Sequence, residues 1–221
     1  MRGYLVSFDP DISSFRYMLS KETVEHDDYF IFISPEASDD NDDKKGRKVL
    51  EKFLADLKDK GMKVKYEFFN IRGGNFVEDL RTLLEYTISK GFEEITIWAV
   101  GGPRSLVTLL TLYGQLDPRV VRIYTFNEDK SREIKVEKLG LTLPKINKEM
   151  ERILDLMKKK GEMTVKNLAE ELKVETSRAY RLANKLVDYG YLSRERGRGI
   201  KLKLTDAGKI ALLLKSLSVT I

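Results

Sequence analysis

Residues 171–197 read ELKVETSRAYRLANKLVDYGYLSRERG, and this stretch decides the fold of the last third of the chain. A tight turn at residues 173–176 is followed by apolar residues at helical spacing, and Gly190 ends that helix. Strand residues and glycines then alternate as they do in a β-hairpin. The order of turn, helix and hairpin predicts the second half of a winged helix-turn-helix domain.

The flanking residues supply the rest of such a domain. Residues 148–160 place apolar side chains on one face and stop at Gly161, which predicts a first helix. Thr164 is a suitable N-cap for a short second helix over residues 165–172. A last apolar helix opens at residues 205–209, and in this fold class it either makes dimer contacts or closes the domain core.

The charge of this region points to a polyanionic partner. Residues 144–221 contain 18 Lys and Arg against 10 Asp and Glu, whereas the remaining residues are net acidic. A recognition helix reads the major groove of duplex DNA, and a basic hairpin tip suits the adjacent minor groove. The alternative is a small helical interaction module with a solvated polar face. The residues predicted to contact DNA are Thr176, Ser177, Arg178, Tyr180, Arg181, Asn184 and Lys185 on the helix, and Arg194, Arg196, Arg198 and Lys201 on the hairpin.

The first 140 residues alternate strand and helix patterns. Short β-branched and aromatic runs predict strands, and apolar residues at helical spacing between them predict helices. This alternation predicts an α/β, Rossmann-like, doubly wound parallel sheet over residues 1–140, followed by the α+β winged domain over 141–221. The predicted strands are residues 3–8, 29–34, 63–69, 94–100 and 120–126, and the helical stretches are 49–57, 76–90 and 106–116.

Three loops follow predicted strands at the edge of the sheet where ligands bind in such folds. Paired glycines let backbone N–H groups approach an anion, and arginines add charge-assisted contacts, although tight turns also use glycine for steric reasons alone. The predicted ligand residues are Ser7, Phe8, Asp9 and Pro10 after the first strand; Arg72, Gly73, Gly74 and Asn75 after the third; and Gly101, Gly102, Pro103, Arg104 and Ser105 after the fourth.

Several functions lose their support in the sequence. Neither GxGxxG nor GxxxxGK[ST] occurs, which argues against dinucleotide cofactors and Walker-type nucleotide hydrolysis. The chain has no Cys and one His, His26. The acidic residues Asp39, Asp40, Asp42 and Asp43 lack the register of an EF-hand calcium site, and we predict that they form a solvated loop. We therefore expect no catalytic residue, no metal and no resident cofactor. No long apolar run is present, so we expect no membrane partner and a cytoplasmic protein.

The whole order of elements resembles the archaeal CRISPR-associated regulators that join a CARF (CRISPR-associated Rossmann-like) domain to a C-terminal winged helix-turn-helix. The resemblance rests on the alternating domain without a dinucleotide motif, on GGPRS at residues 101–105 and on the stretch at 171–197. The high fraction of Lys and Glu, with no Cys, also fits the composition of thermophile proteins.

The resemblance implies a transcription regulator in antiviral defence that senses a cyclic oligoadenylate, cyclic tetra-adenylate, across a symmetric homodimer. It matches the loops at residues 7–10 and 101–105 to the family's two ligand-binding motifs, whereas residues 72–75 are assigned from their own pattern. Two alternatives remain open. One is a ring nuclease that cleaves cyclic oligoadenylate and carries a DNA-binding appendage, and the other is a regulator that answers to a mononucleotide or a sugar phosphate.

Overall fold

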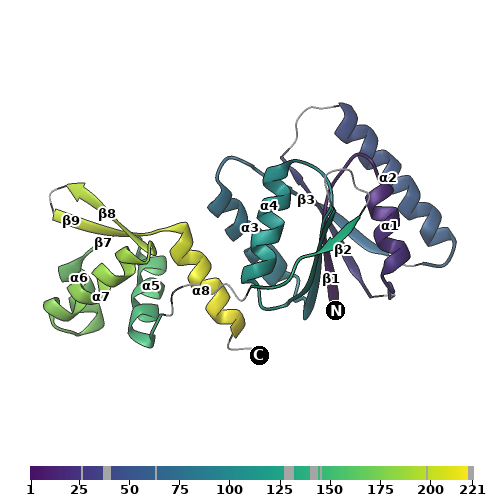
Figure 1. Ribbon diagram of the computed structural model, residues 1–221. Helices are drawn as coiled ribbons and strands as arrows, with labels where there is room; N and C mark the ends of the chain where they lie inside the picture. The colour runs from purple at the N-terminus through teal and green to yellow at the C-terminus, as the bar shows by residue number, and fades with distance from the viewer. Residues whose placement is uncertain are drawn as a thin grey trace. The chain divides into compact units, whose positions relative to one another are not determined.

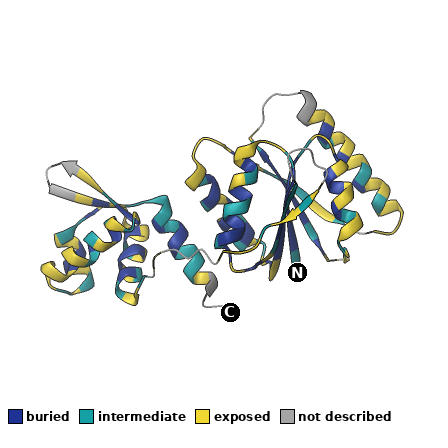
Figure 2. Ribbon diagram, viewed as in Figure 1, coloured by how far each residue is buried: buried dark blue, intermediate teal, exposed yellow. Residues whose placement is uncertain are grey.

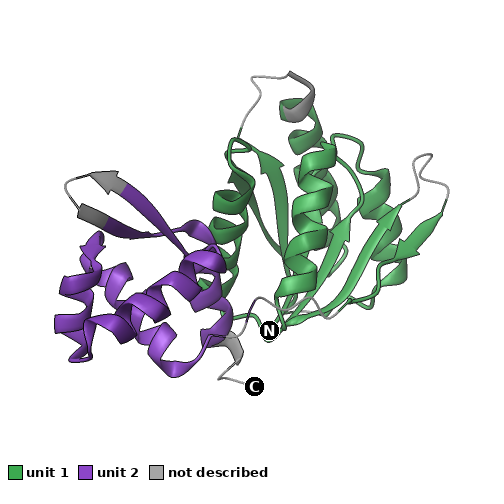
Figure 3. Ribbon diagram, turned by 60° about the vertical axis from the view of Figure 1, so that its left-hand side comes forward, with its two compact units in different colours: residues 1–141 green, residues 142–221 purple. Residues whose placement is uncertain are grey.

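A computed structural model of the chain describes residues 1–25, 27–36, 41–62, 64–126, 132–139, 144, 146–197 and 199–218. The side chains at 41–43, 196–200 and 217–218 are outside this description, as are His26, Asp39 and Asp40. The chain divides into two compact units, residues 1–141 and 142–221 (Figure 3). Each unit is described by itself below.

The first unit is built on a six-stranded sheet with the order β3-β2-β1-β4-β5-β6. Five strands are parallel, and the short edge strand β6 runs antiparallel to β5. The order reverses on either side of β1, so the carboxyl ends of β1 and β4 meet at the position where doubly wound sheets bind ligands. The strands are β1 (Arg2–Ser7), β2 (Tyr29–Pro35), β3 (Lys65–Ile71), β4 (Glu94–Ala99), β5 (Val120–Phe126) and β6 (Glu133–Lys135).

Helices cover both faces of this sheet (Figure 1). On the face of α1 (Ser13–Lys21) and α2 (Asn41–Asp59), an aromatic core includes Tyr4 stacked on Phe30, with ring centroids 4.7 Å apart. On the other face lie α3 (Phe76–Ser89) and α4 (Arg104–Leu116). A Cβ at Gly114 would come within 2.6 Å of Ile123, so α4 packs closely on β5. Figure 2 shows the buried strands between helices whose outer sides are exposed.

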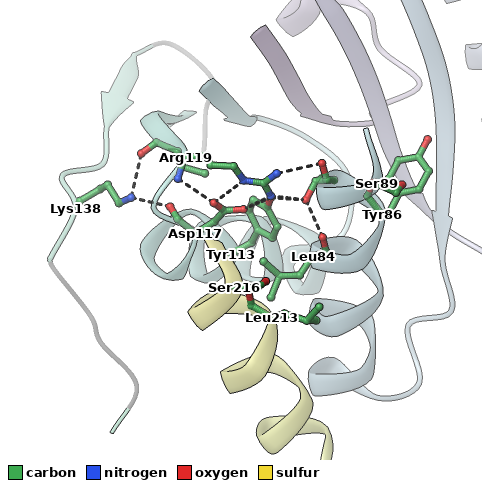
Figure 4. A network of polar contacts seen from close by, with 11 residues as sticks. Leu84, Tyr86, Ser89, Tyr113, Asp117, Arg119, Lys138, Leu213 and Ser216 are labelled. Atoms are coloured by element: carbon green, nitrogen blue, oxygen red, sulfur yellow. Dashed lines mark hydrogen bonds and ion pairs between the residues drawn. The ribbon is translucent and has the colours of Figure 1, made fainter. Parts of the chain in front are cut away.

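A buried polar network lies at the opposite edge of the sheet from the carboxyl ends of β1 and β4 (Figure 4). Arg119 Nη2 lies 2.6 Å from Asp117 Oδ2, which also accepts a 2.6 Å hydrogen bond from the Tyr113 hydroxyl. Arg119 donates further to the carbonyl and hydroxyl oxygens of Thr87. Burial raises the pKa of the Tyr113 hydroxyl well above its usual range, so Tyr113 remains a donor to the carboxylate.

The chain leaves the first unit through residues 136–139, which are tied to the end of α4. The amide nitrogen of Gln115 donates to the carbonyl of Glu137 (2.9 Å), and its amide oxygen accepts from the N–H of Leu139 (2.7 Å). Lys138 Nζ donates to the carbonyls of Asp117 and Val120. The strap formed by residues 136–139 is therefore fixed to the loop between α4 and β5.

The described part of the second unit combines four helices with a small sheet of order β7-β9-β8. The side chain of Thr164 caps α6 by accepting from the N–H of Asn167, as the sequence predicts. The apolar core of the second unit includes Ile153, Leu168 and Leu186. The elements are α5 (Lys148–Lys160), β7 (Met163–Thr164), α6 (Val165–Leu172), α7 (Thr176–Asp188), β8 (Leu192–Gly197), β9 (Gly199–Leu204) and α8 (Asp206–Ser218).

The α/β class and the winged helix-turn-helix are confirmed, but four details of the sequence prediction are wrong. Helix α1 was not predicted, because only nine residues form it and few of them are apolar. The acidic stretch was predicted to be a loop, but α2 already begins at Asn41, so Asp42 and Asp43 are helical. The short strands β6 and β7 were also missed, and β6 makes the sheet mixed rather than wholly parallel.

Candidate functional site

The loops after β1 and β4 meet, as their predicted positions require. The Ser7 hydroxyl accepts hydrogen bonds from the N–H groups of Val100 (2.8 Å) and Gly101 (3.0 Å), and it lies 3.3 Å from the carbonyl of Trp98. Ser7 is only 2% exposed. Its position therefore joins the two strand ends, and a ligand at the surface would meet the neighbouring residues before Ser7.

The two glycines of the second loop permit this close approach. Gly102 has φ +78°, and a Cβ there would lie 2.7 Å from the carbonyl oxygen of Phe8. A Cβ at Gly101 would lie 2.5 Å from side-chain atoms of Asp9. Both glycines are thus needed for the packing of one loop on the other, apart from any contact with a ligand.

The start of α4 is the open part of this edge. Pro103 is the N-cap of α4, and its side chain makes no capping hydrogen bond to the first N–H groups of the helix. Arg104 and Ser105 follow it and are exposed. A helix start with uncapped amides and an adjacent guanidinium attracts anions.

Carboxylates lie at the same edge. Asp9 accepts from the N–H of Asp11, and Asp11 accepts from both the N–H and the hydroxyl of Ser13. Phe8 is buried, whereas Pro10 is exposed. The edge thus offers carboxylates on the β1 side and N–H donors at the start of α4, which suits a ligand that carries both hydroxyl or amino donors and anionic groups.

A small hollow lies among these residues, between the end of β1 and helix α1. Its lining includes Ser7, Asp9, Ile12, Phe32 and Val100, and it has room for about one water molecule. A nucleotide-sized ligand does not fit inside it. Such a ligand would lie on the surface formed by the loops.

The loop at residues 72–75, the third predicted ligand loop, uses several of its polar groups within the chain. The Asn75 side chain caps α3 by accepting from the N–H groups of Val77 (3.1 Å) and Glu78 (3.2 Å), and the N–H of Gly73 donates to Asp79. Three amides of this turn, those of Gly73, Val77 and Glu78, are therefore already hydrogen-bonded within the chain. Gly74 is exposed, and Arg72 lies 3.9 Å from the carboxylate of Glu36.

Sequence reasoning missed Arg47, which lies on α2 at this edge of the sheet. Its Nη2 donates to the Ser34 hydroxyl (2.7 Å) and to Asn70 Oδ1 (2.8 Å), at the ends of β2 and β3. In the sequence Arg47 stands among other charged residues of an amphipathic helix. No local pattern distinguishes it from a solvated surface arginine, because its neighbours come from strands elsewhere in the chain.

In the second unit, α7 separates an apolar face from a polar one. Ala179, Ala183 and Leu186 are buried, and small side chains at the first two positions let α7 pack closely. The opposite face is solvent-exposed except for the half-buried Asn184. The predicted DNA-contacting residues on it are Thr176, Ser177, Arg178, Tyr180, Arg181, Asn184 and Lys185.

The cations of this face differ in their partners. Arg178 forms an ion pair with Glu149 of α5, with 2.5 Å between Nη2 and Oε1. Lys185 lies over the ring of Tyr189. Arg181 is exposed and has no ion-pair partner among the described residues. Among the described residues neither Arg181 nor Lys185 has a carboxylate partner, so both can approach a phosphate or a base without first leaving an ion pair.

A side-chain hydrogen bond links the hairpin to α7, in addition to their shared apolar core. Arg194 on β8 donates through Nη2 to the amide oxygen of Asn184. On β9, Lys201 lies 3.5 Å from Glu162. Arg198 and the side chain of Arg196, both predicted to contact DNA, lie outside the described residues.

Neither metal ligation nor membrane crossing is indicated by the described residues. No group of three or more His, Asp or Glu side chains among them is arranged to hold a metal ion. No helix in the described part of the chain combines the length and the apolar character that crossing a bilayer requires.

Comparisons with known proteins extend this picture. Residues 136–207 match the family described as "Sugar-specific transcriptional regulator TrmB". No curated protein matches the chain. Similar solved structures include a MarR family protein from Bacillus stearothermophilus (16% identity, 35% of this chain, 57% of that chain, TM-score 0.32).

Two further structures are similar at the same level. They are the oxidised form of MarR from E. coli (24% identity, 33% of this chain, 54% of that chain, TM-score 0.31) and YusO from Bacillus subtilis (26% identity, 34% and 57%, TM-score 0.31). The chain spans just over half the length of these structures. The family match and the arrangement of α5, α6, α7 and the hairpin together identify a winged helix-turn-helix of the type carried by DNA-binding transcriptional regulators.

Proposed function

We propose that this chain is a ligand-responsive transcription regulator of a CRISPR-Cas system, with no catalytic activity of its own. In this proposal the C-terminal unit binds duplex DNA, and the N-terminal unit senses cyclic tetra-adenylate as a homodimer. The observation that carries the sensor role is the junction of the β1 and β4 loops, where the carboxylates of the half-buried Asp9 and the exposed Asp11 adjoin the start of α4, which has no side-chain N-cap.

The chemistry of that edge favours a nucleotide over a simple anion. The N–H groups of α4 with Arg104 and Ser105 would bind phosphate oxygens, and Asp9 would accept from ribose hydroxyl or adenine amino groups. The hollow beside β1 is too small to enclose such a ligand. A second copy related by a two-fold axis would offer the same loops to the other half of a symmetric ring, which supports the dimer.

The DNA role rests on the exposed face of α7 and the basic hairpin. In the proposed complex α7 enters the major groove with Thr176, Ser177, Tyr180 and Arg181 foremost, and the hairpin residues Arg194, Arg196, Arg198 and Lys201 lie over the adjacent backbone or minor groove. A ligand that binds one dimer arrangement more tightly would change the spacing of the two α7 helices, and so the affinity for DNA.

The DNA half is tested by the salt dependence of binding to duplex DNA. If a dimer neutralises about six phosphates, the slope of log affinity against log salt concentration is near −5. Fluorescence anisotropy of a labelled duplex at several salt concentrations measures this slope. A flat dependence would remove the case for duplex binding.

The sensor half is tested by calorimetric titration of the full chain with cyclic tetra-adenylate. We expect Arg104→Gln to weaken binding about 10- to 100-fold, the loss expected for one charge-assisted hydrogen bond to phosphate. Thr108→Ala, on the same helix one turn further on, is the matched control and should leave the affinity unchanged. Chromatography of the same mixture tests the ring nuclease alternative, which predicts a linear product.

A second candidate function has one observation in its favour. The matching family is described as sugar-specific, which favours a regulator that answers to a sugar or sugar phosphate. The matched residues 136–207 exclude the loops at 7–10 and 101–105, however, so the match does not extend to the proposed sensor site. Titration with sugar phosphates in place of cyclic tetra-adenylate separates the two candidates.

A further inference from the structure

Arg47 occupies an unusual position at the carboxyl edge of the sheet. Its guanidinium lies over the ring of Phe68 (4.8 Å to the centroid) and near that of Phe8 (5.8 Å). The two hydrogen bonds that it donates, to Ser34 and Asn70, both leave from Nη2 and both end on neutral oxygens. The planar group is thus held between two strand ends and an aromatic surface.

Among the described side chains no carboxylate pairs with Arg47, unlike other arginines with similar burial. Each of the other buried or half-buried arginines in the described part of the chain has a carboxylate within ion-pair distance. These pairs are Arg2 with Asp28 (2.7 Å), Arg81 with Glu85 (2.9 Å), Arg119 with Asp117 (2.6 Å) and Arg122 with Glu22 (3.1 Å). Arg47 is half-buried, and no carboxylate of the described side chains lies within that distance.

The neighbouring groups leave donors without acceptors. A guanidinium has five N–H donors, and those on Nε and Nη1 of Arg47 have no acceptor among the described residues. Asn70 uses its amide oxygen to accept from both Ser34 and Arg47, so its amide N–H groups are also without a partner there. Donors from two side chains, with no carboxylate between them, match a tetrahedral oxyanion such as phosphate.

Packing holds this group in a fixed place relative to the β1 loop. A Cβ at Gly46 would lie 2.5 Å from the Cα of Pro10, so the first half of α2 rests directly on the residues that follow β1. The Arg47 side chain therefore needs little ordering when an anion arrives. Such preorganisation favours binding.

We propose that Arg47 and Asn70, supported by Ser34 and Phe68, form a second anion-binding position for the sensor ligand. It lies on the β2–β3 side of β1, whereas the start of α4 lies on the β4 side. Neighbouring strands are about 4.8 Å apart, so β2 and β4 are about 10 Å apart across β1. Because α2 and α4 lie on opposite faces of the sheet, the ligand class is then a molecule with at least two phosphate groups separated by at least about that distance. This inference rests on the proposed sensor function.

The test uses the full chain with isotope-labelled arginine, and it follows the Nε–Hε NMR signal of Arg47. The probes are inorganic pyrophosphate and cyclic tetra-adenylate. We expect a saturable shift of the Arg47 signal, assigned by its loss in Arg47→Gln. Arg16 is the matched control, because its guanidinium also lies over an aromatic ring, that of Phe53 (5.0 Å), but is exposed on α1. Its signal should not saturate with either probe.

Calorimetry with cyclic tetra-adenylate gives the size of the effect. Arg47→Gln should weaken binding about 10- to 100-fold, the range for a lost charge-assisted hydrogen bond, and Arg16→Gln should not. Arg47→Lys keeps the charge but loses the planar fork, so its affinity should fall between those of Arg47→Gln and the unchanged chain.

A structural role for Arg47 would give a different stability result. Because no carboxylate of the described residues pairs with it, Arg47→Met should leave the urea midpoint unchanged or raise it. A large fall in that midpoint, with ligand affinity retained, would show that Arg47 is a packing residue and overturn the proposal.

The outcomes also separate this proposal from the proposed function. Binding of cyclic tetra-adenylate without movement of the Arg47 signal would overturn the second anion position and leave the sensor function standing. Movement of the Arg47 signal by pyrophosphate alone would support the anion position and contradict cyclic tetra-adenylate as the ligand. If neither probe moves the Arg47 signal or binds calorimetrically, both proposals fail.

Discussion

Arg178 and Arg181 lie three residues apart on α7, yet their surroundings predict different effects on DNA binding. Arg178 is paired with Glu149, whereas Arg181 has no ion-pair partner among the described residues. For a duplex that the unchanged protein selects from a random pool, we expect Arg181→Ala to weaken binding by about 1–3 kcal/mol, the value for one good base contact. Arg178→Ala should cost less, since binding no longer requires the pair to break. Anisotropy titrations on selected and random duplexes measure both, and a larger loss for Arg178→Ala would contradict this assignment.

Asp117 belongs to a buried network in which removal of one charged group leaves its partner without a counter-charge. Arg119 is 8% exposed and Asp117 is fully buried, so Asp117→Ala leaves a cation without its partner inside the unit. We expect a loss of about 3–5 kcal/mol in the free energy of unfolding. Trp98 is the sole tryptophan and is buried in the sheet, so its fluorescence during urea denaturation reports on the first unit.

A control for this loss is the exposed pair of Arg72 and Glu36. Exposed pairs contribute about 0–1 kcal/mol, so Glu36→Ala should barely move the urea midpoint. An equal loss in the two variants would mean that Asp117 does not depend on burial for its effect.

Residue roles at the candidate site were only partly predictable. The rule that parallel strands end at one edge correctly brings the loops at residues 7–10 and 101–105 together. It does not reveal which groups in those loops are already bonded. Ser7 is a polar residue at the end of β1 and Asn75 is one that follows β3, yet Ser7 joins two strand ends and Asn75 caps a helix. Arg47 was unpredictable because its setting is made by β2 and β3.

At the scale of elements, the turn between β4 and α4 depends on the absence of a side chain. Gly102 and Gly73 have similar dihedral angles, with φ +78° and +74°, but only a Cβ at Gly102 meets backbone, at 2.7 Å. Both alanine variants should lose about 1–2 kcal/mol through the left-handed conformation. Gly102→Ala should lose about 1–3 kcal/mol more, because the Phe8 carbonyl must move.

Urea denaturation followed by Trp98 fluorescence measures the difference between these two variants. Equal midpoints would mean that the contact between the two loops adds nothing to the stability of the unit. For the same reason, a loss of ligand affinity in Gly102→Ala would report on loop packing as much as on an anion cradle. Arg104→Gln is the cleaner variant for that purpose.

Long, periodic elements were predictable, and short ones that depend on distant partners were not. The pattern of α7 specifies its buried face, and the N-cap of α6 is visible in the sequence. Strand β7 has two residues and β6 has three, which is too short for any alternation to appear. Helix α1 buries Phe15 and Met18 against a core supplied by β2 and β4. The existence of α1, β6 and β7 depends on tertiary contacts rather than on local propensity.

At the scale of the whole molecule, α4 connects the proposed ligand edge to the strap that leaves the first unit. It begins at Arg104 and ends near Gln115, whose side chain holds the backbone of residues 137 and 139. Gln115→Leu removes both hydrogen bonds, each worth about 1 kcal/mol, with little change of shape. We expect cyclic tetra-adenylate to bind almost as before but to change DNA affinity much less. Anisotropy titrations with and without ligand measure this coupling.

Thr108→Ala, which changes α4 away from the strap, is the control and should retain the full coupling. If Gln115→Leu also retains it, the strap is not the route by which the first unit influences the second.

The central position of β1 keeps the sheet of the first unit incomplete during part of its synthesis. β1 pairs with β2 on one side, but its other partner, β4, comes much later in the chain: Ser7 and Trp98 are 91 residues apart. Contacts of such separation form slowly, whereas the hairpin of β8 and β9 closes locally. An unpaired apolar strand edge is a template for aggregation. Nascent chains that end between residues 71 and 94 therefore carry a central strand with one open edge, and every molecule passes through this stage before its sheet is complete.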